Sequence, residues 1–415
     1  MPTDKKRKIR NTIAITMALV MMLLGIAALD DSNVNPSYGA DENLVDNPNY
    51  VDRQIIVVFN ENVDRASAAD IVAFALSEEL ISERKASKGI KNIRDSINIK
   101  KIKTDNNMML ISLDTDVDEK AAAKEIAKNP DVDSAQPNYI YTLNKESESV
   151  GNHKSGDWYL EFIGANKAQK LITNKNKNAE KVIVASLDTG VVDDHEALSG
   201  VETISTSTDI IVDGHGTQMA GLIANTAGKN NIKILDVDIF DEENKYTTGS
   251  ITTTADAVAG IDYACRHDAR IVTMAFGRHG YDNALVGKME WAAKEDVLLI
   301  AAAGDKAGEE AWYPADYENC MGCADITKPD AETGDKEYIH APGTQISVAD
   351  LNGGFIEKSG TAYSMAISAG TAAMIMCANS DITADEVAEV LVDTETADGC
   401  VNAYKAVSKA LKGKK

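Results

Sequence analysis

The second half of this chain alternates between short apolar runs and helical segments, and this alternation restricts the fold more than any other feature. The apolar runs cover residues 181–187, 232–237, 271–274 and 297–303. Runs of this kind, separated by helices, are typical of parallel strands that are covered by helices on both faces. Two amphipathic segments, 384–392 and 401–412, predict helices at the end of the chain. The sequence therefore predicts an α/β domain over residues 157–415.

A smaller unit is predicted before this domain, over residues 51–144. Its apolar patterns predict a strand, a helix, two paired strands, a second helix and a last strand, at residues 53–59, 66–80, 96–103, 108–114, 117–128 and 134–143. The order β-α-β-β-α-β is that of a ferredoxin-like α+β sandwich. This fold alone identifies no function.

Polar segments separate the predicted units. Residues 30–50 are rich in Asn, Asp, Ser and Pro and predict a linker. Residues 145–156 form a second polar linker, between the small unit and the α/β domain. Solvated segments of this kind are where proteolytic nicking concentrates, so we expect processing there.

The first 29 residues have the pattern of an export signal. A basic cluster at residues 5–10 precedes an uncharged stretch at 11–29, as in secretory signal peptides. The apolar stretch also approaches the length that spans a bilayer. A cleaved signal peptide and a retained N-terminal anchor both fit this pattern. Either one predicts a secreted or cell-surface protein, with membrane contact only through this segment.

Net charge and cysteine content argue against a nucleic-acid site and against a zinc site. The formal net charge of −23 argues against a nucleic-acid partner, which would need a basic face. The five cysteines cannot all pair within the chain. Cys320 and Cys323 have metal or redox spacing, but no second cysteine pair completes a zinc site. We therefore assign no metal site and expect both thiols to be small buried hydrophobes.

Two residues carry the pattern of an acid–base pair. Asp188 follows an apolar run and is expected at the carboxyl end of a strand, the edge where catalytic groups of α/β sheets gather. His215 lies between Gly214 and Gly216, which allow close approach of other backbone or a substrate. A buried carboxylate that holds one imidazole nitrogen lets the other nitrogen accept a proton.

Two later segments can complete such a site. The predicted strand at 297–303 ends at Gly304, so Asp305 is expected at the active edge, where a donor can stabilise an oxyanion. Gly360 and Thr361 predict a tight turn before a helix. The next residue, Ala362, then lies at a helix N-terminus, a position that favours a negative reacting atom.

In this order, the four segments resemble the subtilisin-like serine proteases (subtilases), and the similarity covers about residues 157–407. The resemblance implies a subtilisin-like parallel sheet and hydrolysis of peptide bonds in peptide or protein substrates. Asp188 would orient His215, and His215 would be the general base. The substrate cleft would be bordered by Ala275, Phe276 and Gly277, which flank the primary specificity pocket, and by Gly304.

The resemblance extends to the small unit. Residues 51–144 are similar to the inhibitory propeptide of this family, with residues 136–139 as its closing strand. This implies that the chain carries its own propeptide in its cleft until the linker is cut. No cofactor is assigned. The family often binds structural calcium, but its scattered oxygen ligands leave no local sequence signature.

Two positions depart from the family pattern. The family has serine, the nucleophile, where this chain has Ala362, and asparagine, the oxyanion donor, where it has Asp305. Ser364 would replace the nucleophile only after a two-residue shift, which rotates a helical position by about 200°. The ungapped spacing from Gly360 to Gly370 keeps Ala362 at the site. Loss of the nucleophile in this class costs about 10⁶ in turnover.

Three interpretations of the whole chain therefore stay open. The first is a protease zymogen whose serine was replaced by alanine, which traps the precursor. The second is a natural pseudoprotease that binds peptides or partner proteins without cleaving them. The third is a structural or surface protein without a function in its cleft.

Overall fold

The computed structural model describes residues 50–60, 62–82, 97–102, 107–113, 118–144, 147–148, 157–175, 180–205, 213–240, 251–304, 312–327, 336 and 338–413. All of them belong to one compact unit, Pro48–Lys415. The expected signal or anchor at 1–29, nearly all of the linker at 30–50, and Asp305 lie outside the described residues.

Residues 157–413 contain the predicted parallel sheet. Its strand order is β15-β14-β12-β10-β6-β8-β7, and every neighbouring pair is parallel. The strands are β6 (Val182–Asp188), β7 (Glu202–Ser205), β8 (Ile232–Asp238), β10 (Ile271–Met274), β12 (Leu298–Ala302), β14 (Met321–Asp325) and β15 (Ile339–Ala341). After β6 the chain adds β7 and β8 on one side and then crosses to β10 on the other. Such a switch point is where open α/β sheets bind ligands, at the carboxyl ends of the strands.

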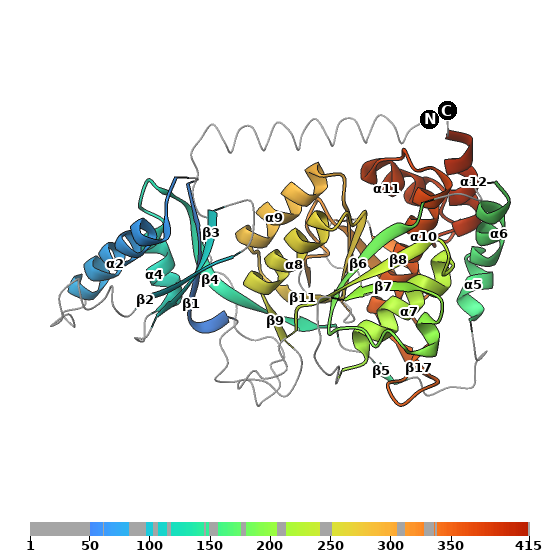
Figure 1. The fold of residues 1–415 in the computed structure, drawn as a ribbon, viewed down its shortest axis with the longest axis horizontal. Coiled ribbons are helices and arrows are strands. Elements are labelled where there is room, and N and C mark those ends of the chain that lie inside the picture. Colours follow the sequence, from blue (N-terminus) through green and yellow to red (C-terminus); the bar gives the residue numbers. More distant parts are fainter. Residues whose placement is uncertain are drawn as a thin grey trace. The chain divides into compact units, whose positions relative to one another are not determined.

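Helices cover both faces of this sheet, as predicted (Figure 1). One face carries α8 (Thr254–Arg266) and α9 (Asn283–Lys294). The other carries the helices α5 (Trp158–Phe162), α6 (Ala165–Lys175), α7 (His215–Ala227), α10 (Thr361–Ala378), α11 (Ala384–Asp393) and α12 (Ala403–Gly413), and a short 3-10 helix follows β6 at Glu196–Leu198. Among the described residues, α10 is the one helix long and apolar enough to cross a membrane, but it is wholly buried. It is therefore the central core helix of the domain.

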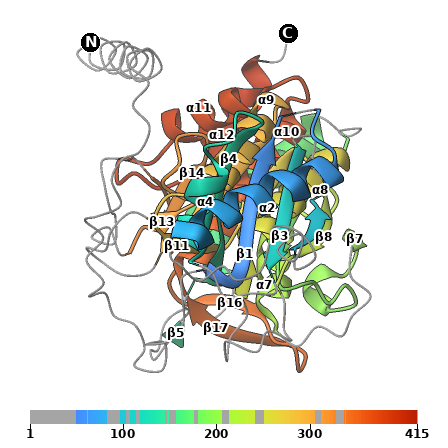
Figure 2. The ribbon, with the colours of Figure 1, turned by 90° about the vertical axis from the view of Figure 1, so that its left-hand side faces the viewer.

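Residues 50–143 have the predicted order β-α-β-β-α-β. The elements are β1 (Tyr50–Phe59), α2 (Arg65–Ser82), β2 (Ile97–Lys101), β3 (Asn107–Leu113), α4 (Glu119–Ile126) and β4 (Val132–Leu143). The strands pair antiparallel in the order β4-β1-β3-β2, which is the ferredoxin-like arrangement. Helices α2 and α4 lie side by side on one face of this sheet (Figure 2).

The two faces of β1 show how the small unit attaches to the α/β domain. Ile55, Val57 and Phe59 are buried in the core that the small sheet forms with α2 and α4. Ile56, between them, belongs to the core cluster that contains α8 and α9. Successive side chains of a strand point to opposite faces, so one face fills the unit's own core and the other packs on the α/β domain.

Six short strands complete the fold: β5 (Ser147–Glu148), β9 (Ile251–Thr253), β11 (Phe276–His279), β13 (Trp312–Tyr313), β16 (Ile346–Ala349) and β17 (Phe355–Ser359). Strand β5 lies inside the segment expected to be a linker, and it pairs with β17. The sequence pattern did not predict these strands, because each is short; β16 and β17 form a local hairpin, and the other four pair only with residues far away in the sequence.

The cysteines are free thiols. Cys320 and Cys323 are buried, Cys323 within β14, as the sequence suggested. Burial raises the pKa of each of these two thiols to about 12. Thiols with such a pKa stay protonated near neutral pH and are poor nucleophiles or metal ligands.

Candidate active site

The predicted acid–base pair is formed at the carboxyl edge of the parallel sheet. Asp188 is the last residue of β6, and His215 is the first residue of α7. The His215 Nδ1 atom lies 2.8 Å from the Asp188 Oδ1 atom, and the two side chains are only 5% and 2% exposed. The same oxygen accepts the backbone N–H of Thr189 at 2.8 Å. An ionised Asp188 can only accept, so it fixes the proton on Nδ1 and leaves the acceptor lone pair of a neutral imidazole on Nε2.

A glycine makes this geometry attainable. A Cβ atom on Gly216 would lie 2.3 Å from the carbonyl oxygen of Gly190, so only glycine allows α7 to start against the turn after Asp188. The Gly216 N–H donates to the Thr189 hydroxyl at 3.1 Å across the same contact. The sequence signal around His215 is thus explained by close backbone approach.

The predicted nucleophile position lies at the start of the buried helix α10. Ala362 is its second residue and is fully buried. Helices α10 and α7 are joined one residue further on, where the Tyr363 hydroxyl donates to the Gln218 side chain at 3.0 Å. Ser364 faces a different element, since its hydroxyl donates to the carbonyl of Ala341 in β15 at 3.0 Å. This contact supports Ala362, and not Ser364, as the residue at the site.

The end of the small unit pairs with two strands of the α/β domain at the same sheet edge. Residues 140–142 of β4 pair antiparallel with β9, and residues 142 and 143 pair antiparallel with Gly277 and Phe276 of β11. The backbone N–H of the next residue, Asn144, donates to the carbonyl of Ala275 at 3.1 Å. Residues 140–144 therefore add a strand between two strands of the α/β domain, a common mode of peptide recognition.

The chain then continues past the start of α10. The Asn144 Nδ2 atom lies 3.4 Å from the Thr361 hydroxyl, next to Ala362. Beyond Asn144, Ser147 and Glu148 of β5 pair with Ser359 and Lys358 of β17, directly before the turn at Gly360. Asn144 and β5 thus both contact residues that lie shortly before Ala362 in the sequence.

Three of the four predicted cleft residues contact Asn144 or its partner Trp312, whereas Phe276 lies elsewhere. Ala275 accepts its N–H, and Gly277 and Gly304 both lie against the indole of Trp312; Cβ atoms on them would come within 2.1 and 3.3 Å of that ring. The ring of Phe276 lies elsewhere: its centroid is 5.7 Å from the Tyr141 ring, so it contacts the residue three positions before Asn144. Sequence reasoning missed Trp312, because no local pattern distinguishes it.

A second missed feature is the buried carboxylate of Asp282, directly before α9. It accepts hydrogen bonds from the Gln136 amide (2.8 Å), the Tyr141 hydroxyl (2.8 Å) and the Thr254 hydroxyl (2.6 Å). Burial, and then the charge of Asp282, holds the pKa of Tyr141 well above its ordinary value. Side chains of β4 also accept the first N–H groups of both helices: Gln136 that of Ala284, and Asn138 that of Ala255, each at 3.1 Å. The small unit therefore caps α8 and α9.

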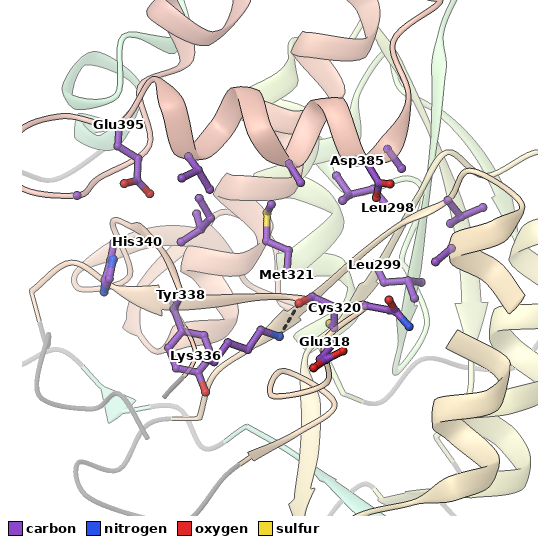
Figure 3. Close-up of a pocket in the computed structure, with 18 residues that line it drawn as sticks. Leu298, Leu299, Glu318, Cys320, Met321, Lys336, Tyr338, His340, Asp385 and Glu395 are labelled. Carbon is purple, nitrogen blue, oxygen red and sulfur yellow. Dashed lines mark hydrogen bonds between the residues drawn. The ribbon is translucent and has the colours of Figure 1, made fainter. Parts of the chain in front are cut away.

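A cavity of about 410 Å³ lies elsewhere, at the amino ends of β12, β14 and β15 (Figure 3). Leu298, Met321 and Ile339 line it, and the Lys336 ammonium beside it donates to the carbonyls of Ala315, Tyr317 and Cys320. This sheet edge is opposite to the one that carries Asp188. The cavity is not the active site. Within the described part of the chain, no group of three or more His, Cys, Asp and Glu side chains can hold a metal ion, so no calcium ligands are assigned.

One carboxylate near the pair predicts a pH effect on stability. Burial, opposed by the hydrogen bond from Ser205 and helped by the charges of Asp238 and Asp188, raises the pKa of Asp236 in β8 from 3.8 to about 6. The folded state thus binds this proton more tightly than the unfolded chain, and stability present below about pH 4 is lost as the pH rises through 6. We expect Asp236→Asn to stabilise the chain at pH 7 by about 2 kcal/mol and to flatten this dependence. Urea unfolding between pH 4 and 8 measures it. The exposed Asp194→Asn should leave the profile unchanged, and an equal effect of both would refute the assignment.

Comparisons with known proteins all match this chain to proteases of one family. A model of the subtilase family matches residues 179–410. A thermostable alkaline protease of Halalkalibacterium halodurans is 26% identical over 69% of this chain and 78% of its own length. A thermophilic serine proteinase of a Bacillus species is 23% identical over 96% of this chain and 98% of its own length. Among solved structures, fervidolysin of Fervidobacterium pennivorans superposes on this chain with a TM-score of 0.67 at 20% identity. The match covers 86% of this chain and 61% of the fervidolysin chain, which is described as a keratinolytic enzyme related to subtilisin.

Proposed function

Because this chain belongs to the subtilase family, we propose that it is the precursor of a serine endopeptidase that hydrolyses peptide bonds in peptide or protein substrates. One observation carries the proposal: the buried Asp188–His215 pair, with its 2.8 Å contact, lies at the sheet's ligand-binding edge beside a strand-like peptide. Asp188 orients the imidazole, and His215 is the base that a serine at position 362 would need. With Ala362 there, the chain is inactive as written. A Ser→Ala replacement that traps the precursor accounts for an otherwise assembled site.

The small unit is proposed to be the inhibitory propeptide of this precursor. Its last strand occupies the groove that a substrate would use, and its side chains cap α8 and α9. A peptide held in the groove by both strand neighbours excludes other substrates. The unit would leave after the chain is cut behind β4.

Export is part of the same proposal. The basic cluster and apolar stretch of residues 1–29 support a secreted or cell-surface location, reached through a cleaved signal or a retained anchor. A matched protease of Bacillus subtilis, 28% identical over 57% of this chain, is named as an extracellular protease, which agrees with the N-terminal pattern.

A natural pseudoprotease is the second candidate. Two positions, Ala362 and Asp305, depart from the family pattern together, which is what relaxed selection on catalysis would leave. Such a protein would still bind peptides or a partner protease in the groove. The third interpretation, a structural protein, would need neither the buried pair nor the groove.

One variant separates these candidates. Ala362→Ser in the full chain is assayed for release of the segment before about residue 150 and for peptide hydrolysis. Self-processing supports the protease precursor. An inert Ala362→Ser chain favours the pseudoprotease if added peptides compete with residues 140–144 for the groove of the parent chain. A chain that shows neither hydrolysis nor peptide binding favours the structural protein.

Asp305 gives a second, smaller prediction. An ionised carboxylate at the oxyanion position repels the charge that develops in the transition state, whereas an amide donates to it. We expect Asp305→Asn, added to Ala362→Ser, to raise kcat about 10²-fold. Steady-state hydrolysis at pH 7 measures it. A kcat that does not rise would show that Asp305 is not the oxyanion donor.

The capping contacts of β4 predict how tightly the small unit is held. Gln136→Ala removes both the donor to Asp282 and the acceptor of the Ala284 N–H, and both of these groups are buried. Unsatisfied buried groups cost about 1–3 kcal/mol each, so we expect a loss of about 2–3 kcal/mol in the unfolding free energy. Urea denaturation of the parent chain measures it. Asp133→Asn, an exposed change in the same strand, is the control, and equal losses in the two variants would contradict the capping role.

A further inference from the structure

The side chain of Asn144 is bound as specifically as the backbone of the strand that it follows. It is 4% exposed. The Trp312 indole N–H donates to its Oδ1 atom at 3.0 Å, and its Nδ2 atom lies 3.4 Å from the Thr361 hydroxyl. Both ends of the amide therefore have a partner, and one partner precedes Ala362 directly.

Trp312 determines the size of this pocket. Its indole lies against Gly277 and Gly304, from two different strand ends, and leaves no room for a Cβ atom on Gly277. The ring is held in place: the Trp312 backbone N–H donates to Asp316 at 2.7 Å, and its ring meets that of His279 at 5.0 Å. The indole thus forms a fixed floor that presents one N–H donor, so the pocket is short and polar.

From these contacts we propose that the groove selects asparagine on the acyl side of the cleaved bond, that Trp312 determines this preference, and that the bond between Asn144 and Lys145 is the processing site. The inference rests on the proposed function, because it treats residues 140–144 as a bound substrate segment. It names the substrate class: peptides with an asparagine directly before the bond that is cut.

The alternatives to asparagine each lose something in this pocket. Leucine has nearly the same shape but leaves the indole N–H without its acceptor, and sites built to bind a polar group reject analogues that lack it. Glutamine adds one methylene against a fixed ring, which is overpacked. Aspartate can accept from the indole but buries a charge that no cation contacts in the described pocket.

The register also places the scissile bond. The Asn144 N–H donates to the carbonyl of Ala275, and its side-chain amide lies 3.4 Å from the hydroxyl of Thr361, the residue directly before Ala362. We therefore take the bond that follows Asn144 as the bond at the Ala362 position. In an Ala362→Ser chain, the serine oxygen would bond to the Asn144 carbonyl carbon as its proton passes to His215. The bond to the Lys145 nitrogen then breaks, and that nitrogen takes the proton. Water hydrolyses the acyl ester, which leaves a carboxylate on Asn144 and restores the serine.

The test compares self-processing of full-length Ala362→Ser chains. We expect the new N-terminus to be Lys145, read by mass spectrometry of the fragments. Asn144→Leu should slow processing about 10²-fold, and Trp312→Phe, which keeps a ring but removes the N–H, about tenfold. In the Trp312→Phe chain, Asn144→Leu should cost only about tenfold more. Trp158→Phe is the matched control, since it also loses one indole hydrogen bond, to the Gln345 carbonyl, away from the groove.

A second measurement needs no hydrolysis. In the parent chain with Ala362, Asn144→Leu and Trp312→Phe should each speed hydrogen exchange of the Asn144 backbone amide about tenfold. The double variant should exchange no faster than Asn144→Leu alone, because both remove the same contact.

The outcomes separate the inference from the proposed function. Processing at another bond, or equal rates for Asn144 and Asn144→Leu, overturns the asparagine preference and leaves the protease intact. No processing at all contradicts the proposed function, and the exchange data then decide whether Trp312 recognises Asn144. Additive exchange effects, about 10²-fold in the double variant, would refute that recognition.

Discussion

Replacing Ala362 by serine is expected to raise peptide-bond hydrolysis by about 10⁶-fold, the scale on which loss of the nucleophile lowers turnover in subtilisin, a member of the same family. The physical reason is the state of the site around position 362. The Asp188–His215 contact is already at 2.8 Å and buried, and the start of α10 is ordered against α7 through Tyr363 and Gln218. A serine hydroxyl adds one atom to a fully buried alanine position in an assembled site.

Release of the small unit is the first measurement, because the bound segment at 140–144 is already in the groove and needs no diffusion. Gel analysis over time gives a rate for the Ala362→Ser chain and a limit for the parent. His215→Ala in the Ala362→Ser chain is the control and should return the rate to the parent level. Cleavage that survives His215→Ala would come from another protease, and the proposed mechanism would then have no support.

Much of the fold was predictable, because its signals are local. The parallel strands could be predicted because they are short apolar runs, and the observed β10 has the predicted bounds, Ile271–Met274. Among the predicted helices and strands the errors lie at the ends: the helix expected at 117–128 runs only over Glu119–Ile126, and its start is set by the Asp118 side chain, which accepts the Ala121 N–H. Asp188 and His215 were found for the same reason, since one follows an apolar run and the other is framed by glycines.

What the sequence could not provide is pairing over long distances. Trp312 and Asn144 are 168 residues apart, and Gln136 and Asp282 are 146 apart. Neither pair belongs to a periodic pattern or a sequence motif. Each contact exists only in the folded chain, where β4 lies against the α/β domain. The same holds for β5, which lies in a segment whose polarity predicts a linker, yet it gains order by pairing with β17. The proposed asparagine preference therefore rests on contacts that a single sequence does not encode locally.

The second large effect is expected from Asp188→Asn in the Ala362→Ser chain, which should lower hydrolysis about 10⁴-fold. Asp188 accepts from His215 Nδ1 and from the Thr189 N–H through one oxygen. An asparagine amide turned toward the imidazole would donate to Nδ1 and favour the tautomer with its proton on Nε2, which cannot accept the serine proton. The geometry is kept and the base is lost.

Two readouts distinguish this tautomer effect from a folding defect. The unfolding free energy of the Asp188→Asn chain should stay within about 2 kcal/mol of its parent, because the side-chain volume is kept and only the Thr189 N–H loses its acceptor. The residual hydrolysis should rise with hydroxide concentration, since a strong external base can replace the lost one in part. An Asp188→Asn chain that keeps full activity would mean that His215 is oriented by other groups, and Asp188 would then be a structural cap of the turn at Thr189.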